Sequence, residues 1–231
     1  MSAPAALEAR GLSGGYGRVT VVRELELRVA AGEVVALLGR NGAGKTTALL
    51  TLAGALRPHA GEVRLGGRAQ RGGLSRRARE GLAVMTDDRA VFQRLTAREN
   101  LRLGRGWGRE AAALALFPEL EPLLETPAGM LSGGQQQMLG LARALAARPR
   151  VLLVDELSQG LAPVIVQRLL RALRAAADDG AAVLLVEQQA RLVLGIADRA
   201  QLLANGCLTL HRSAAELSGG GLAELERAYL A

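Results

Sequence analysis

The sequence predicts an α/β fold in which a mostly parallel sheet is flanked by helices, with an antiparallel β subdomain and an inserted α-helical subdomain. Short aliphatic runs at 33–38, 151–154 and 182–186 have the length and composition of strands that are buried on both faces. Helical stretches separate these runs, and this alternation is typical of a parallel sheet. Residues 88–149 hold no convincing strand, so we expect the helical subdomain there.

The chain has 231 residues, of which 49% are hydrophobic, and this is enough for one domain with a buried core. Within that domain we expect a core lobe from residues 1–87 and 150–211. We expect a helical lobe from residues 88–149 and a C-terminal tail from residues 212–231. The opening strands of the core lobe are expected to form the antiparallel subdomain.

Local signals place the first helices. A helix is expected over 45–55, directly after the first buried strand, and a short strand over 82–85. Thr96 and Glu99 have the spacing of a capping box, which predicts that a helix begins there. Glycines break that helix before a further short helix over 109–117.

Turn and cap signals place the remaining elements. Pro163 suits the first turn of a helix. Asn205-Gly206 lies between two strand-like runs and predicts a hairpin. Ser213 and Glu216 have cap spacing and predict a last short helix.

Composition limits the classes of function. The net charge is +7, and the basic residues are almost all arginine, which suits acidic partners such as nucleotides or anionic lipid headgroups. A solvated arginine-rich surface explains most of these arginines equally well. The few aromatic residues make stacking platforms for single-stranded nucleic acid unlikely to form, so we expect no nucleic-acid partner. A single cysteine excludes a disulfide framework.

The only lysine, Lys45, lies in a glycine-rich segment that fits the pattern G-x-x-x-x-G-K-[ST]. A predicted strand precedes the segment and a predicted helix follows it, as a phosphate-binding loop requires. Lys45 is placed to reach the phosphate oxygens of a nucleotide, and the Thr46 hydroxyl is placed to ligate Mg²⁺. This P-loop predicts an NTPase core that binds ATP and Mg²⁺ through Gly39, Arg40, Asn41, Gly42, Ala43, Gly44, Lys45, Thr46 and Thr47.

Two adjacent acids follow the aliphatic run 151–154. Asp155 and Glu156 come at the carboxyl end of a predicted buried strand, where open α/β sheets bind ligands. Asp155 is placed to hold Mg²⁺ through water, and Glu156 is placed to polarise the attacking water.

The tetrapeptide Leu-Ser-Gly-Gly occurs at 12–15, 131–134 and 217–220. Only the second copy begins a helix, expected over 135–147, because Ser132 and Gln135 have capping-box spacing. The start of such a helix presents free N–H groups to a phosphate, so we predict nucleotide binding by Ser132, Gly133, Gly134 and Gln135. We interpret the first copy as a turn and the third as part of the tail.

The order of these motifs carries a resemblance. A P-loop, then Leu131-Ser-Gly-Gly-Gln135, then Asp155-Glu156 resembles the ATP-binding subunit of an ABC transporter over nearly the whole chain. In that family two subunits pair head to tail, and each ATP lies between the P-loop of one and the Leu-Ser-Gly-Gly-Gln helix of the other. The resemblance therefore implies a dimer that closes on ATP.

The resemblance assigns roles to further positions. Tyr16 falls where an aromatic residue stacks on adenine, and Ser158–Leu161 takes the place of the D-loop, which contacts the opposite site. Gln188 replaces the switch histidine of the family, and Asp87 stands where the lid glutamine is expected. Gln188 and Asp87 are thus predicted catalytic residues together with Lys45 and Glu156, and Asp87 is also a predicted metal ligand.

Several departures from the general pattern are similar to one branch of the family. They are Val186-Glu187-Gln188, Leu161-Ala162-Pro163, the segment Phe92–Leu101 and the ending Glu226–Leu230. They resemble the smaller ATPase subunit of importers for branched-chain amino acids. An acid commonly replaces the lid glutamine in that branch, but as glutamate, and Asp87 is one methylene shorter. Importers of urea or short amides use closely similar ATPases and remain an alternative.

The resemblance also implies partners and a location. We expect membrane permease subunits, a second ATPase subunit that is either different or identical, and indirect cooperation with a solute-binding protein. The expected place is the cytoplasmic face of the plasma membrane, as a peripheral protein.

Two other classes fit less well. A DNA-repair or chromosome ATPase with the same ATP sandwich would carry a coiled coil or a zinc insertion between the half-sites, and this chain has neither pattern. A subunit that binds ATP without hydrolysing it would explain Asp87 and Gln188 but not the intact Lys45, Asp155 and Glu156.

Overall fold

The computed structural model describes residues 5–86, 91–103, 109–193 and 195–216. Its larger sheet has six strands in the order β10-β9-β3-β8-β7-β6, and all neighbours are parallel except β9 and β10. The bounds are β3 (Val34–Leu38), β6 (Leu82–Met85), β7 (Val151–Asp155), β8 (Ala182–Glu187), β9 (Arg199–Ala204) and β10 (Cys207–Ser213). The mostly parallel sheet expected from the sequence is therefore confirmed. The hairpin expected at Asn205-Gly206 joins β9 to β10.

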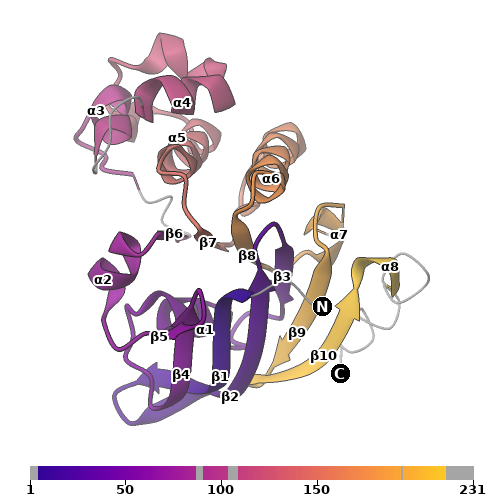
Figure 1. Cartoon of the computed structure of the whole chain (residues 1–231). Coiled ribbons are helices and arrows are strands. Elements are labelled where there is room, and N and C mark those ends of the chain that lie inside the picture. Colours follow the sequence, from indigo (N-terminus) through magenta and orange to yellow (C-terminus); the bar gives the residue numbers. More distant parts are fainter. Residues whose placement is uncertain (1–4, 87–90, 104–108, 194, 217–231) are drawn as a thin grey trace.

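A second, antiparallel sheet has the order β2-β1-β4-β5 and lies beneath the parallel sheet in Figure 1. Its strands are β1 (Ala5–Tyr16), β2 (Val19–Ala30), β4 (Ala60–Leu65) and β5 (Arg68–Ala69). The expected antiparallel subdomain is thus confirmed.

The interpretation of Leu12–Gly15 as a turn is wrong, because these residues belong to β1. Gly15 makes this possible, since a Cβ there would lie 1.9 Å from the Val19 carbonyl oxygen of the opposing strand. Irregular register between β1 and β2 at this point accommodates the close approach. The turn itself lies at Gly17-Arg18.

The two faces of the parallel sheet carry separate cores, as the alternation of side chains along a strand requires. Val34, Ala36 and Leu38 of β3 pack with helices of the helical lobe and with α6. Val35 and Leu37 of the same strand pack with α1 and the antiparallel sheet. Every residue of β3 is buried, which explains its uninterrupted aliphatic sequence.

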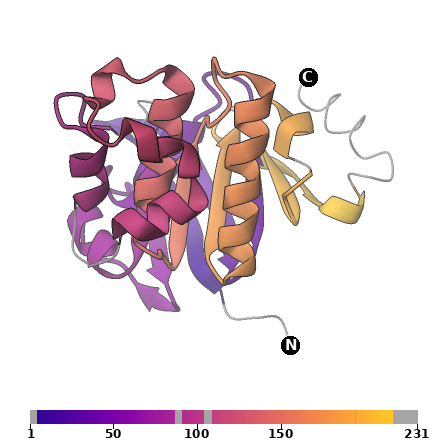
Figure 2. The ribbon, with the colours of Figure 1, turned by 90° about the horizontal axis from the view of Figure 1, so that it is seen from above.

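Helices cover one face of the parallel sheet in Figures 1 and 2, and α5 and α6 lie side by side there. The helices of this layer are α3 (Ala97–Arg102), α4 (Arg109–Leu116), α5 (Gly133–Ala146) and α6 (Pro163–Asp178), with 3₁₀ turns at Pro118–Leu123 and Ala128–Met130. Both capping boxes expected from the sequence, at Thr96/Glu99 and Ser132/Gln135, are present, and Pro163 lies in the first turn of α6.

The remaining helices are α1 (Lys45–Ala53), α2 (Leu74–Arg79), α7 (Ala190–Val193) and α8 (Ala214–Glu216). Helix α1 ends two residues earlier than expected, because Gly54 takes a left-handed conformation at its C-cap. Among the described residues, no helix has the length and apolar character that crossing a membrane requires.

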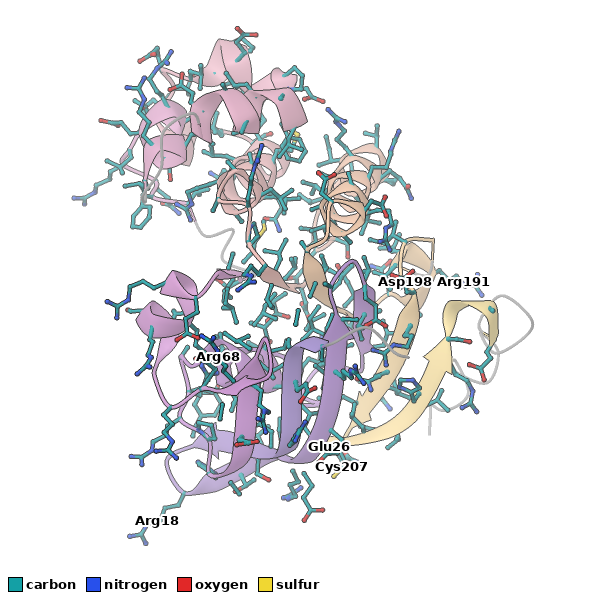
Figure 3. The ribbon with its side chains drawn as sticks, viewed as in Figure 1. Arg18, Glu26, Arg68, Arg191, Asp198 and Cys207 are labelled. Atoms are coloured by element: carbon teal, nitrogen blue, oxygen red, sulfur yellow. The ribbon has the colours of Figure 1, made fainter. Side chains whose placement is uncertain are left out.

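The three arginines labelled in Figure 3 lie on different parts of the molecule. Arg18 lies in the turn between β1 and β2, Arg68 in β5 and Arg191 in α7, and all three side chains are exposed. Their exposure fits the interpretation of a solvated arginine-rich surface.

Candidate nucleotide site

Three parallel strands end at one edge of the sheet, and each is followed by residues of the predicted site. Strand β3 leads into the P-loop, β7 ends at Asp155, and β8 ends at Glu187. The register pairs Leu38 with Glu187 and Asp155 with Val186, so these ends are level with one another. The structure therefore brings the P-loop, the two acids after β7 and Gln188 to one place, at the carboxyl edge where such sheets bind ligands.

Two glycines fix the path of the P-loop. A Cβ on Gly39 would lie 2.5 Å from the Leu203 carbonyl oxygen, so only glycine lets the chain leave β3 beside β9. Gly44 has φ +102°, a conformation that favours glycine, and it is the N-cap of α1. The first helical N–H groups of α1 consequently open toward the loop, which is the arrangement that binds phosphate.

The lysine and the second acid meet at this edge. Lys45 Nζ lies 3.4 Å from Glu156 Oε1 and donates to the Arg40 carbonyl oxygen at 3.2 Å. The Lys45 side chain is only 4% exposed, so its charge is held beside the loop rather than in bulk water. A cation and a carboxylate thus face each other where a nucleotide phosphate and its attacking water would lie.

The backbone of Glu156 is unusual for a glutamate. Its φ is +42°, in the left-handed region, and its N–H donates to the Val186 carbonyl oxygen at 3.0 Å. Non-glycine residues adopt this region at a cost, and they cluster at functional sites. The turn aims the Glu156 side chain toward Lys45.

The residue at the switch position bonds the P-loop. Gln188 Nε2 donates a hydrogen bond to Asn41 Oδ1. Asn41 is an exposed residue of the loop, so this bond spans the carboxyl ends of β3 and β8. The structure therefore brings Gln188 to the P-loop, and its contact with phosphate stays a prediction.

Glu187 is a further residue of this edge that the sequence did not predict. It is buried, and it accepts hydrogen bonds from the Ser158 N–H and hydroxyl. Burial raises the pKa of its carboxyl group, while the bonds from Ser158 and Gln188 act in the opposite direction. An acid that ends an otherwise aliphatic strand was the available signal, but its partner is evident only from the fold.

The oxygen donors expected to hold Mg²⁺ are chemically suitable. Thr46 offers a hydroxyl at the start of α1, and Asp155 offers a buried carboxylate at the end of β7. Mg²⁺ prefers such oxygen ligands and is commonly held by one or two side chains together with substrate phosphates. The third predicted ligand, Asp87, lies outside the described residues.

Residues 131–135, the predicted Leu-Ser-Gly-Gly-Gln segment, have the expected local form but lie apart from the P-loop. Ser132 Oγ accepts from the Gln135 N–H at 3.3 Å, and Gln135 Oε1 accepts from the Ser132 N–H at 2.9 Å. In the described part of the chain, neither side chain bonds the P-loop. Within the described structure, the hydrogen bonds of Ser132 and Gln135 thus cap α5 and do not join it to this chain's own P-loop.

Tyr16 lies at the exposed end of β1, beside the turn of the β1–β2 hairpin. Further along the same hairpin, the side chains of Val21 and Val22 line the space next to Gly44. The hairpin that carries Tyr16 thus reaches the P-loop, which is compatible with the predicted contact to adenine.

Comparison with known proteins identifies the family. Residues 22–159 match the ABC transporter family. The chain is 40% identical, over 87% of its length and 90% of the relative's, to the high-affinity branched-chain amino acid transport ATP-binding protein BraG of Pseudomonas aeruginosa. It is 38% identical, over 87% of both chains, to the lipopolysaccharide export system ATP-binding protein LptB of Acidithiobacillus ferridurans.

A solved structure described as an ATP-binding subunit of an ABC transporter superposes with a TM-score of 0.85 and 26% identity, covering 98% of this chain and 100% of that one. The sequence match and the shared fold agree along nearly the whole length. The chain therefore belongs to the ABC transporter family and is an ATPase of that family.

Proposed function

We propose that this chain is the ATP-hydrolysing motor subunit of an importer for branched-chain amino acids, in which closure of an ATP sandwich dimer drives a membrane permease. The main structural support for ATP hydrolysis is the contact between Lys45 and Glu156. Their charged atoms lie 3.4 Å apart at the carboxyl edge of the parallel sheet. The likeness to BraG over 87% of this chain supports the choice of solute.

The residues of the chain divide the work of hydrolysis. The P-loop N–H groups and Lys45 bind and neutralise the phosphates. The Glu156 carboxylate accepts a hydrogen bond from the attacking water and orients it toward the γ-phosphate. The Gln188 amide, already at the P-loop through Asn41, donates a hydrogen bond to the γ-phosphate. Tyr16 covers the adenine ring.

Thr46 and Asp155 would hold Mg²⁺, with Asp87 as the further ligand that we propose. The ion supplies positive charge that neutralises the phosphate oxygens of the nucleotide. Thr46 offers a hydroxyl and Asp155 a carboxylate, which are donor types that Mg²⁺ prefers.

A second subunit completes each site. ABC ATPase subunits dimerise and work with membrane permeases. We propose that Ser132, Gly133, Gly134 and Gln135 bind the γ-phosphate held by the partner's P-loop. The separation of this segment from the P-loop of its own chain supports that proposal. We favour a heterodimer, in which the partner is a different ATPase. In the alternative homodimer, the partner is a second copy of this chain.

Two exposed apolar side chains on the helical lobe are candidate contacts for the permease. Phe92 is 57% exposed and Met130 is 77% exposed, although both are large apolar side chains. The Gly129 N–H donates to the Gln93 carbonyl oxygen at 2.9 Å, which links the segments that carry them. Exposed apolar patches mark interaction sites.

We propose that the chain is a peripheral protein at the cytoplasmic face of the membrane. A solute-binding protein would then act on it only indirectly, through the permease.

Uptake measurements test the solute. We expect a strain that lacks this chain to lose uptake of labelled leucine and isoleucine and to regain it with the wild-type chain but not with Glu156→Gln. Loss of urea uptake instead would favour the alternative importer of urea or short amides. Unchanged uptake of both solutes would contradict an importer role for either.

A further inference from the structure

We propose that Glu187 is a positioning residue that joins the D-loop segment, Ser158–Leu161, to the P-loop through one continuous chain of hydrogen bonds. This inference rests on the proposed ATP hydrolysis, because the two segments that it joins flank the proposed site. Glu187 does not contact the reacting atoms in this account; it acts through Ser158 and Gln188.

The contacts of Glu187 account for both of its oxygens. Oε1 accepts the Ser158 N–H at 2.9 Å. Oε2 accepts the Ser158 hydroxyl at 3.0 Å and the Gln188 N–H at 3.3 Å. The side chain is therefore held from two directions, by the D-loop segment and by the residue at the switch position.

The sheet register puts Glu187 between the two loops. Glu187 pairs with Leu38, the last residue of β3 before the P-loop. On the other side, the Glu156 N–H donates to the Val186 carbonyl oxygen, so the chain that leaves β7 toward Ser158 passes β8 just before Glu187.

The chemistry of the position argues against simple filling of the core. Ala182–Val186, the rest of β8, is entirely aliphatic and buried, and an aliphatic residue at 187 would cost nothing in desolvation. Glu187 is 2% exposed, so its carboxyl group must be stabilised by the hydrogen bonds that it accepts. Burying such a group without one of its hydrogen-bond partners is costly, so movement of Ser158 or Gln188 should affect the other partner as well.

The chain of bonds continues to the P-loop. Gln188, whose N–H bonds Glu187, donates through Nε2 to Asn41 Oδ1. Ser158, Glu187, Gln188 and Asn41 thus form a path from the D-loop segment to the loop that cradles the phosphates. Phosphate binding that shifts Asn41 or Gln188 is expected to change the hold of Glu187 on Ser158.

Hydrogen exchange of the D-loop amides tests this link without depending on turnover. In the wild-type chain we expect Mg²⁺ with AMP-PNP, a nucleotide that resists hydrolysis, to slow exchange in residues 157–161 by about tenfold, because phosphate bound at the P-loop would stabilise Gln188 and with it the existing bonds of Glu187 to Ser158. In Glu187→Ala we expect less than about a twofold change in exchange, with AMP-PNP affinity within about threefold of wild type, because the phosphate contacts remain.

Two further variants distinguish loss of the link from a general loss of stability. Ser158→Ala removes only the hydroxyl bond and should reduce the nucleotide-dependent change partially. Gln201→Ala is the matched control, because Gln201 is also a buried polar residue on a parallel strand, bonded to His211 away from the P-loop. Gln201→Ala should keep the full wild-type response even if it lowers stability.

A wild-type response in Glu187→Ala would overturn the link, as would an equal loss of response in Gln201→Ala. Absence of AMP-PNP binding by the wild-type chain would contradict the proposed function itself, and it would be visible before any variant is compared.

Discussion

Glu156 combines a strained backbone, partial exposure and a contact with the only lysine of the chain. We expect Glu156→Gln to bind ATP within about threefold of wild type and to lose at least about 100-fold in kcat, since general-base catalysis contributes factors of this size. Steady-state ATPase rates and equilibrium binding of a fluorescent ATP analogue measure the two effects. Turnover that is unchanged in Glu156→Gln would remove this residue from the role of base.

Lys45→Met is the matched comparison for that variant. It removes the buried cation that neutralises the phosphates, so both binding and turnover should fall. The contrast between the two variants separates water orientation at Glu156 from phosphate binding at Lys45.

Gln188 has no titratable proton, unlike the histidine that the family usually has at this position. We therefore expect the ATPase rate to show little inflection near pH 6.5 from this position. Gln188→His should introduce such an inflection, because histidine titrates there. Gln188→Ala should lower kcat, and a rate like that of the wild type would show that Gln188 does not sense the phosphate.

Arg77 is a buried arginine whose structural role was not predictable from the sequence. No sequence signal separates Arg77 from the many other arginines of the chain, yet it is 2% exposed. Its NH1 group donates to the carbonyl oxygens of Thr51 and Leu52 at the end of α1, and Nε donates to that of Gly72 at 3.2 Å. Burial lowers the pKa of its guanidinium. Only the packing of α2 on α1 distinguishes it from its neighbours.

We expect Arg77→Met to lower the free energy of unfolding by about 2 kcal/mol, because carbonyl oxygens at the end of α1 lose a charged donor. Arg76→Met, at an exposed pair with Glu80, should cost less than about 1 kcal/mol. Urea denaturation midpoints of the two variants make the comparison. Equal small losses would show that Arg77 does not support α1.

At the scale of elements, two helices begin with the same capping box but differ in their predicted use. Thr96 caps α3 and Ser132 caps α5. We expect Thr96→Ala and Ser132→Ala each to cost about 1 kcal/mol of stability, which thermal or urea unfolding would measure. Only Ser132→Ala should also lower the ATPase rate, because α5 is the helix proposed to face the partner's nucleotide. Equal effects on the rate would reduce residues 132–135 to a structural role.

The elements also show where sequence reasoning succeeded. Aliphatic runs such as 151–154 predicted buried strands because a parallel sheet needs apolar residues on both faces. The motif Leu-Ser-Gly-Gly at 12–15 was misassigned because its glycines suggested a turn, whereas Gly15 permits close pairing of β1 with β2. A local pattern cannot distinguish a glycine that turns the chain from one that admits a neighbouring strand.

In the candidate site, too, local sequence patterns predicted some residues, whereas contacts between distant segments were not predictable. Lys45 and Glu156 were predictable, since the P-loop pattern and a strand followed by two acids are local signals. The bond of Glu187 to Ser158 and that of Gln188 to Asn41 join residues far apart in the sequence. They depend on the register of β3, β7 and β8, which no local pattern specifies.

At the scale of the whole molecule, the chain carries two segments that we propose to bind phosphate, the P-loop and residues 132–135, and the described side chains of these segments do not bond each other. The P-loop and its surrounding acids end the parallel sheet, whereas Ser132 begins α5 in the helical layer shown in Figures 1 and 2. A site made from both segments needs a second subunit. Closure on ATP would then bring the helical lobe of one subunit against the P-loop of the other and transmit that movement to the permease.

Sedimentation of purified Glu156→Gln, with and without Mg²⁺ and ATP, tests this arrangement most directly. The account predicts that ATP converts the monomer into a dimer if this chain pairs with itself. If its natural partner is a different ATPase, ATP should produce the dimer only when that subunit is added. A chain that binds ATP yet stays monomeric with and without a partner ATPase would contradict the shared ATP site.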